Sequence, residues 1–174
     1  MTERIIILID GQSTHAAMRA DGTTIDYAQM VAALTGDRYL VRPYFFALEI
    51  EGPDEFRPLR SLLDFLEYHG FAVETKVVRE LEGGRREKTS IAVDLASRAF
   101  DLCDAVEHIV ICTGDEQFVP LLKALQRRGL RVTIAAVLGR CSDELRRQAD
   151  HFIDLDKMRE AITRPARQKE AVSA

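Results

Sequence analysis

The chain has 174 residues, of which 47% are hydrophobic and 30% charged, a balance typical of one globular domain with a covered core. The formal net charge of -4 argues against a protein that coats nucleic acid through bulk positive charge, although a local basic patch remains compatible with it. No apolar run is long enough to span a membrane, and Ile5–Ile9 is too short for a signal peptide, so we expect a cytoplasmic protein.

The first third of the chain predicts a strand, two helices and a second strand. Arg4–Ile9 is a continuous β-branched run, which is typical of a central parallel strand buried on both faces. Helical patterning follows through Ala20 and returns over Tyr27–Leu34. Tyr39–Leu48 predicts the next strand, in which Pro43 either weakens the assignment or marks an edge.

The rest of the chain continues this alternation. Further helices are expected at Phe56–Tyr68, Thr89–Cys103, Phe118–Arg128, Ser142–Ala149 and Lys157–Ile162. Further strands are expected at Phe71–Val78, His108–Cys112, Leu130–Val137 and Phe152–Ile153. The pattern predicts a single three-layer α/β domain over residues 1–163, with a mostly parallel central sheet and helices on both faces. The polar segment from Thr163 should fray, leaving a flexible tail over residues 164–174.

The apolar stripe of the Phe56–Tyr68 helix has two interpretations. The apolar residues of this helix form a helical stripe: Leu59, Leu62, Leu63, Phe65 and Leu66. They belong either to the core, which we favour, or to the face of a homo-oligomer.

Two aspartates are candidate site residues because each follows an apolar strand. Asp10 precedes Gly11, Asp115 follows Gly114, and such glycines let the backbone turn tightly. Ligands of open α/β sheets bind outside the carboxyl ends of the strands. Paired carboxylates repel each other, so a site that gathers them favours Mg²⁺ or Mn²⁺. The alternative is that both aspartates only form turns.

Several common sites are missing from the sequence. No G-x-G-x-x-G follows the first strand and no Walker A loop occurs, so we expect no nucleotide cofactor. Asp10 lacks the second aspartate of an aspartyl-phosphate phosphatase, and no G-x-S-x-G elbow is present.

Several motifs in order resemble one known family. Ile9-Asp-Gly-Gln-Ser13 is similar to the opening of NYN domains, where a strand leads into Asp-Gly-x-Asn. The segment from Val110 to Leu122 is similar to their Ser-Gly-Asp-x-Asp-Phe-x-Pro-Leu motif. The resemblance, to the LabA-like branch of the PIN-like nucleases, runs from Arg4 to about Met158. It implies a metal-dependent ribonuclease fold in which Asp10 and Asp115 are metal ligands and RNA is the partner.

The chain also departs from the family pattern at several positions. Ser13 replaces the family's asparagine, and Gln117 replaces its second aspartate. Counted without a gap from Lys88, two further acidic positions hold Ala92 and Arg98. We prefer this count, although a small gap would place Asp94 on the second of them.

Arg98 and Asp94 therefore each have two interpretations. The Arg98 guanidinium either occupies the place of a metal beside Asp10 or Asp115, or pairs with Asp94 four residues earlier. Asp94 is either a solvated helix residue or a substitute ligand. Arg79, Arg85, Arg86 and Lys88 either contact phosphate oxygens or form a solvated charged loop.

Three functions remain open from the sequence. The favoured one is an RNA-binding or regulatory protein with a partly degenerate acidic site and weak or no catalysis. The alternative is an active Mg²⁺- or Mn²⁺-dependent ribonuclease that uses Asp10, Asp94 and Asp115. The third is an interaction protein that has lost RNA. Besides the three aspartates, the predicted site contains the substrate-binding candidates Ser13, Lys88, Arg98, Thr113 and Gln117.

Overall fold

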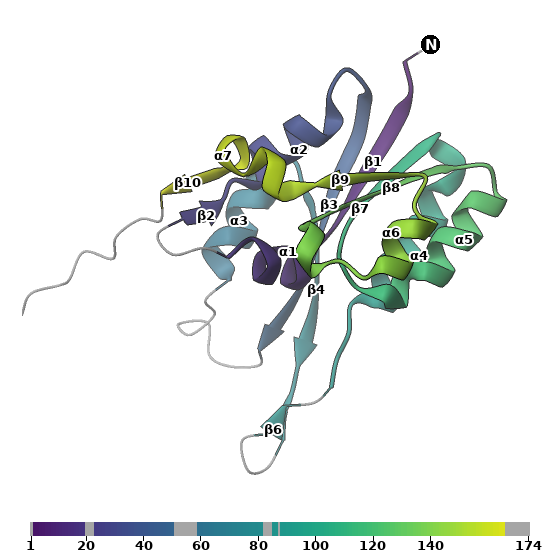
Figure 1. Ribbon diagram of the computed structural model, residues 1–174. Helices are drawn as coiled ribbons and strands as arrows, with labels where there is room; N and C mark the ends of the chain where they lie inside the picture. Colours follow the sequence, from purple (N-terminus) through teal and green to yellow (C-terminus); the bar gives the residue numbers. More distant parts are fainter. Residues whose placement is uncertain (1, 20–22, 51–58, 82–84, 87, 166–174) are drawn as a thin grey trace, which may run out of the picture.

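The computed structural model describes residues 2–19, 23–50, 59–81, 85–86 and 88–165 (Figure 1). A six-stranded sheet has the order β4-β3-β1-β7-β8-β9, and each neighbouring pair is parallel. These strands are β1 (Arg4–Asp10), β3 (Tyr39–Ile50), β4 (Ala72–Val78), β7 (His108–Cys112), β8 (Arg131–Ala136) and β9 (His151–Asp154). The helices are α1 (Gly11–Met18), α2 (Tyr27–Thr35), α3 (Arg60–Tyr68), α4 (Ala92–Leu102), α5 (Val119–Arg127), α6 (Asp143–Gln148) and α7 (Arg159–Ile162).

Helices cover both faces of the sheet, so the predicted three-layer α/β fold is confirmed. Alternate residues of β1 point to opposite faces, as the pleat of a strand requires. Ile6 and Leu8 pack in the core beneath α4, α5 and α6. Ile5, Ile7 and Ile9 pack in the core beneath α1, α2, α3 and α7. Complete burial of each of these side chains contributes about 1.5–3 kcal/mol to folding.

Pro43 lies within an interior strand, at a point where that strand is paired on one side only. β3 runs between β1 and β4, and Pro43 is opposite Ile7 of β1. Pairing with β4 begins only at Tyr44, opposite Ala72. Pro43 therefore sits where one side of β3 is still locally an edge, which explains why a proline is tolerated there.

The residues directly after α7 form a strand that the sequence did not predict. Thr163–Pro165 forms β10, which pairs antiparallel with β2 (Thr23–Ile25). The expectation that the chain frays from Thr163 is therefore wrong for residues 163–165. The rest of the predicted tail lies outside the described residues. The pairing is supported by a backbone bond of 2.8 Å from the Asp26 amide to the Ile162 carbonyl.

β5 (Glu80–Leu81) and β6 (Arg85–Arg86) pair antiparallel as a small hairpin. Residues 82–84 lie outside the described part. In α3, Leu63 and Leu66 are buried in the core, which supports the core interpretation of that helix, and its predicted start at Phe56 lies outside the described residues. No helix among the described residues is long and apolar enough to cross a membrane.

Candidate functional site

The two candidate aspartates come together because β1 and β7 are neighbours that end at the same edge of the sheet. Ile9 is opposite Cys112, so Asp10 and Thr113 leave the sheet side by side. The Asp10 side chain caps α1, and the Asp115 side chain caps the short 3-10 helix Glu116–Phe118. Both carboxylates line one cleft of about 420 Å³, here named the acid cleft.

The glycines beside the aspartates are required by close packing. A Cβ on Gly11 would lie 2.6 Å from Cζ of Phe45 and 2.8 Å from the Phe46 carbonyl oxygen. A Cβ on Gly114 would collide with the backbone carbonyl of Arg140. The sequence predicted glycines for tight turns, and the structure adds that neighbouring chain segments leave no space for a side chain.

The acid cleft combines two carboxylates with neutral polar side chains. Its polar lining consists of Asp10, Gln12, Ser13, Thr89, Ser90, Asp115 and Gln117. Ile91, Ala92 and Phe118 supply the apolar part of the lining. No lysine or arginine of the described residues belongs to this lining, so the two carboxylates give the cleft a negative charge.

Asp10 is the more buried carboxylate, with 7% of its surface exposed. Its Oδ1 accepts a hydrogen bond of 3.0 Å from the Ser13 amide, and its Oδ2 accepts one of 3.2 Å from the Thr113 hydroxyl. Burial raises the pKa of Asp10 and nearby Asp115 raises it further, whereas the hydrogen bonds from Ser13 and Thr113 oppose this rise.

Thr113 connects the two carboxylates. Its hydroxyl donates to Asp10 and accepts a hydrogen bond of 3.3 Å from the Asp115 amide. Thr113 is 1% exposed and does not line the acid cleft. Its predicted role in substrate binding is therefore better described as positioning of both aspartates.

Ser13 has a comparable bridging position. Its hydroxyl accepts a hydrogen bond of 3.2 Å from the Gly114 amide, which ties α1 to the turn after β7. Unlike Thr113, Ser13 lines the acid cleft.

Gln117 acts on Asp115 as a hydrogen-bond donor. Its backbone amide donates to Oδ1 of Asp115 at 3.0 Å, and its side-chain amide nitrogen donates to Oδ2. Gln117, at the position of the second aspartate of the motif, therefore forms hydrogen bonds to Asp115, the aspartate of the motif that is kept. It adds no charge of its own to the acid cleft.

α4 presents Ala92 to the acid cleft, whereas Asp94 and Arg98 are absent from its lining. Asp94 pairs with Lys76 of β4, at 3.0 Å from Nζ to Oδ2. Of the two acidic positions of the gapless count, Ala92 lines the acid cleft and Arg98 does not. Lys88 is exposed and immediately precedes Thr89 of the lining.

Both interpretations of Arg98 are wrong. Its Nε lies 2.7 Å from Oε1 of Glu74 on β4, and its Nη1 lies 3.5 Å from Oδ2 of Asp101. Its guanidinium also lies 5.7 Å from the centroid of the Tyr44 ring. The sequence carried one signal for this pairing, the opposite charges of Glu74 and Lys76. Residues two apart on a strand share a face, and this face of β4 meets α4.

The donor set of the acid cleft is small for a metal centre. Among the described residues no group of three or more His, Cys, Asp or Glu side chains is arranged to hold a metal ion. The acid cleft offers two carboxylates, and each of their four oxygens already accepts a hydrogen bond.

Comparison with known proteins identifies the family. The sequence profile of the NYN domain matches residues 4–156, which is most of the chain. The chain belongs to the NYN-domain family. Its membership places it among the PIN-like ribonuclease folds, as the motifs at Asp10 and Asp115 predicted.

One relative of this NYN-domain chain is the Low amplitude and bright protein LabA of Synechococcus elongatus. The two are 25% identical over 178 residues, covering 98% of this chain and 94% of LabA. A crystal structure of a Vibrio parahaemolyticus protein of unknown function is 26% identical, with a TM-score of 0.74 over 89% of this chain and 94% of the other. The family and the fold are therefore established.

Proposed function

We propose that this NYN-domain protein is an RNA-binding, regulatory protein with weak or no catalytic activity. The observation that supports this proposal is the composition of the acid cleft. Asp10 and Asp115 are its only carboxylates among the described residues, and α4 presents Ala92 where the family pattern has an acidic residue.

The residues of the acid cleft do not fit a tightly bound Mg²⁺ or Mn²⁺. Such hard cations favour several charged oxygen ligands, and the acid cleft offers two carboxylates. Asp115 is engaged by both nitrogens of Gln117. We therefore assign no catalytic step to a metal.

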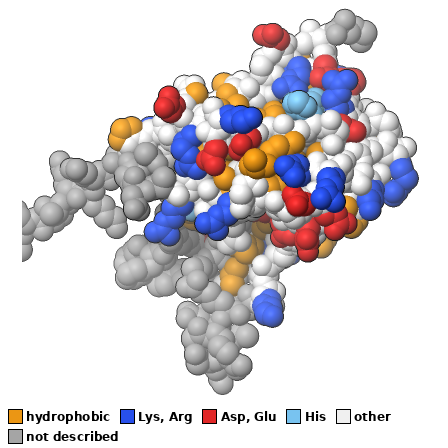
Figure 2. All heavy atoms as spheres, in the orientation of Figure 1, with side chains coloured by type: hydrophobic (Ala, Val, Ile, Leu, Met, Phe, Trp, Pro, Cys, Tyr) orange, Lys and Arg blue, Asp and Glu red, His pale blue; other side chains and the backbone are white. Residues whose placement is uncertain are grey.

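RNA is the partner that the family membership favours. Lys88, exposed beside the cleft lining, is a candidate for contact with a phosphate oxygen. On the face shown in Figure 2, Lys and Arg side chains are interspersed with Asp and Glu and form no continuous basic patch. We therefore expect modest RNA affinity that weakens with salt, with a small slope because few phosphates are neutralised.

Calorimetric titration with Mn²⁺ tests the metal part of this proposal, with Asp10→Asn as the control. We expect no binding to the native protein at millimolar Mn²⁺. Binding that disappears in Asp10→Asn, together with metal-dependent cleavage of RNA, would instead establish the alternative, an active ribonuclease.

A salt-dependent gel shift with single-stranded RNA tests the RNA part. A retarded complex at low salt that dissociates as salt rises is the expected result. Absence of a complex at low salt would overturn RNA binding and favour a protein that kept the fold for interaction with other proteins.

A further inference from the structure

A second cleft, larger than the acid cleft, lies on the same side of the sheet as α1 and α3. Its volume is about 680 Å³, within the usual range of about 300–1,000 Å³ for small-molecule sites. We name it the α1–α3 cleft, because His15 of α1 and Leu62 and Phe65 of α3 line it. The β2–β10 pair completes its wall, beside α3 in Figure 1.

Tyr27, at the start of α2, is the unusual residue of this cleft. It lines the cleft, is only 3% exposed, and packs edge-to-face on Phe45 with ring centroids 4.9 Å apart. Within the described part of the chain, its hydroxyl is the one buried side-chain polar atom that lacks a hydrogen-bond partner. A buried hydroxyl without a partner costs about 1–3 kcal/mol, a cost that a ligand with an acceptor atom would remove.

The hydroxyl is available as a donor at neutral pH. Burial raises the pKa of Tyr27 far above its usual range, and Cys112 and Asp10 raise it further. The phenol therefore keeps its proton. Because its oxygen is covered in this fold, a ligand in the cleft would reach it only after the Tyr27 side chain moves.

The other end of the cleft is positively charged. The Arg164 guanidinium lies over the Phe65 ring, 5.5 Å from its centroid, and its ion pair among the described residues is a long one of 3.8 Å with Asp26. Its side chain remains 52% exposed. His15, also exposed, lines the cleft as well. An anionic group at this end would gain a partner without displacing a short ion pair.

The cleft therefore offers apolar walls, one buried donor and an exposed cation. A nucleotide matches all three features, since its base has apolar faces and acceptor atoms on its edge, and its phosphate is an anion. We infer that the α1–α3 cleft binds a nucleotide presented by single-stranded RNA, with the base against Ile25 and Leu62 and the phosphate beside Arg164. This inference rests on the proposed RNA-binding function.

The position of α1 connects this site to the acid cleft. Gln12 and Ser13 of α1 line the acid cleft, and His15, two residues further, lines the α1–α3 cleft. An RNA strand that crosses α1 can therefore occupy both clefts at once. The second cleft would add affinity that depends on the base and not on a metal.

Two binding measurements test the inference. Fluorescence anisotropy with a short 5′-labelled single-stranded RNA, in EDTA, measures binding of the strand. Thermal shift with the four nucleoside 5′-monophosphates measures binding of the free nucleotide.

The variants are Tyr27→Phe and Arg164→Gln. Matched controls are Tyr39→Phe, an exposed tyrosine at the start of β3, and Arg60→Gln, an exposed, ion-paired arginine of α3 outside the cleft lining. Tyr27→Phe should weaken RNA binding by about threefold to tenfold, the value of one hydrogen bond. The same change should raise the melting temperature, because it removes the unpartnered hydroxyl. Arg164→Gln should weaken binding and reduce its salt dependence, whereas the two controls should bind as the native protein does.

The outcomes separate this inference from the proposed function. RNA binding that is unchanged in both cleft variants would overturn the α1–α3 site and leave RNA binding intact. Binding of free nucleotides that Tyr27→Phe weakens, without any binding of RNA, would keep the site and overturn the proposed function. If neither ligand binds the native protein, both are overturned. A fall in RNA affinity with a lower melting temperature in Tyr27→Phe would also count against the site, because loss of packing would then explain the change.

Discussion

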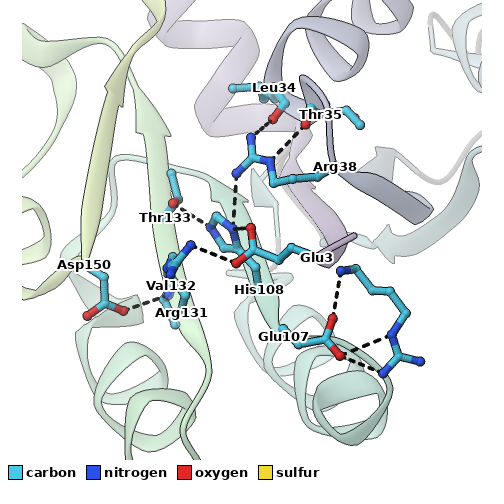
Figure 3. A network of polar contacts seen from close by, with 11 residues as sticks. Glu3, Leu34, Thr35, Arg38, Glu107, His108, Arg131, Val132, Thr133 and Asp150 are labelled. Carbon is cyan, nitrogen blue, oxygen red and sulfur yellow. Dashed lines mark hydrogen bonds and ion pairs between the residues drawn. The ribbon is translucent and has the colours of Figure 1, made fainter. Parts of the chain in front are cut away.

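His108 and Thr133 are joined by a buried hydrogen bond of 2.7 Å between Nε2 and Oγ1, linking β7 to β8 (Figure 3). On the other side of the ring, Nδ1 lies 3.2 Å from Nη1 of Arg38 and 3.2 Å from Oε2 of Glu3. Arg131 in turn holds Glu3 at 2.8 Å. The network holds β7 and β8 together where they begin, at the end of the sheet opposite the acid cleft.

This network predicts a loss of stability in mild acid. Burial lowers the pKa of His108, although Glu3 opposes the effect and Arg38 and Arg131 assist it. Below about pH 6.5 the unfolded chain takes up a proton that the folded protein resists. The free energy of unfolding should therefore decrease as the pH falls from about 6.5 towards the lower pKa of the folded state, by at most about 1.4 kcal/mol per pH unit.

Urea unfolding between pH 5 and pH 7 measures this slope. His108→Gln should flatten it, whereas His151→Gln, at an exposed position of β9, should leave it unchanged. A slope that is the same in the native protein and in His108→Gln would contradict the prediction.

Asp10 should destabilise the fold at neutral pH. Its pKa is raised in the folded state, chiefly by burial, so stability is lost as the pH rises through the ordinary aspartate range. Asp10→Asn keeps an acceptor for the Ser13 amide and removes the buried charge. We expect a gain on the order of 1 kcal/mol at pH 7, or about 2–4 °C in melting temperature, which disappears at pH 3. An equal gain at both pH values, measured by thermal unfolding, would mean that charge is not the cause.

The positions of Asp10 and Asp115 were predictable because they depend on local sequence. Each follows a fully buried strand, and parallel neighbours end at the same edge. The glycine beside each aspartate reinforced this prediction. Thr113 was predicted as a site residue, but its role as the link between the carboxylates depends on the register of β1 with β7.

The partners of α4 were not predictable from local sequence. Arg98 pairs with Glu74, 24 positions away, and Lys76 pairs with Asp94, 18 positions away. Both pairs depend on how α4 crosses the edge strand β4, which helical periodicity does not specify. The strand Thr163–Pro165 was missed for a similar reason, because its partner β2 is a short polar segment near the other end of the chain.

Gly114, next to Asp115 of the acid cleft, should not tolerate a side chain. A Cβ there would collide with the Arg140 carbonyl, and the Gly114 carbonyl also accepts a hydrogen bond of 3.0 Å from the Ser142 amide. Gly114→Ala should therefore destabilise the protein by about 3 kcal/mol or more, since backbone on both sides must move. Gly139→Ala is the matched control, because a Cβ at Gly139 has no neighbour within 4 Å among the atoms of the described residues. Chemical unfolding that gives similar losses for both variants would refute the packing explanation.

Gln117→Asp tests whether the acid cleft is weakened or lost as a metal site. The change removes the amide nitrogen that donates to Asp115 and adds a carboxylate to the cleft lining. If Gln117 is what limits cation binding, Mn²⁺ affinity measured by calorimetry should rise at least about tenfold, because hard cations respond to the number of charged oxygens. Adding Ala92→Asp, from the wall that α4 contributes, should raise it further. Asp94→Asn in the same background is the control, since Asp94 pairs with Lys76 outside the cleft lining and should not alter Mn²⁺ affinity. An absence of Mn²⁺ binding in the double variant would mean that the cleft has lost more than its acidic residues.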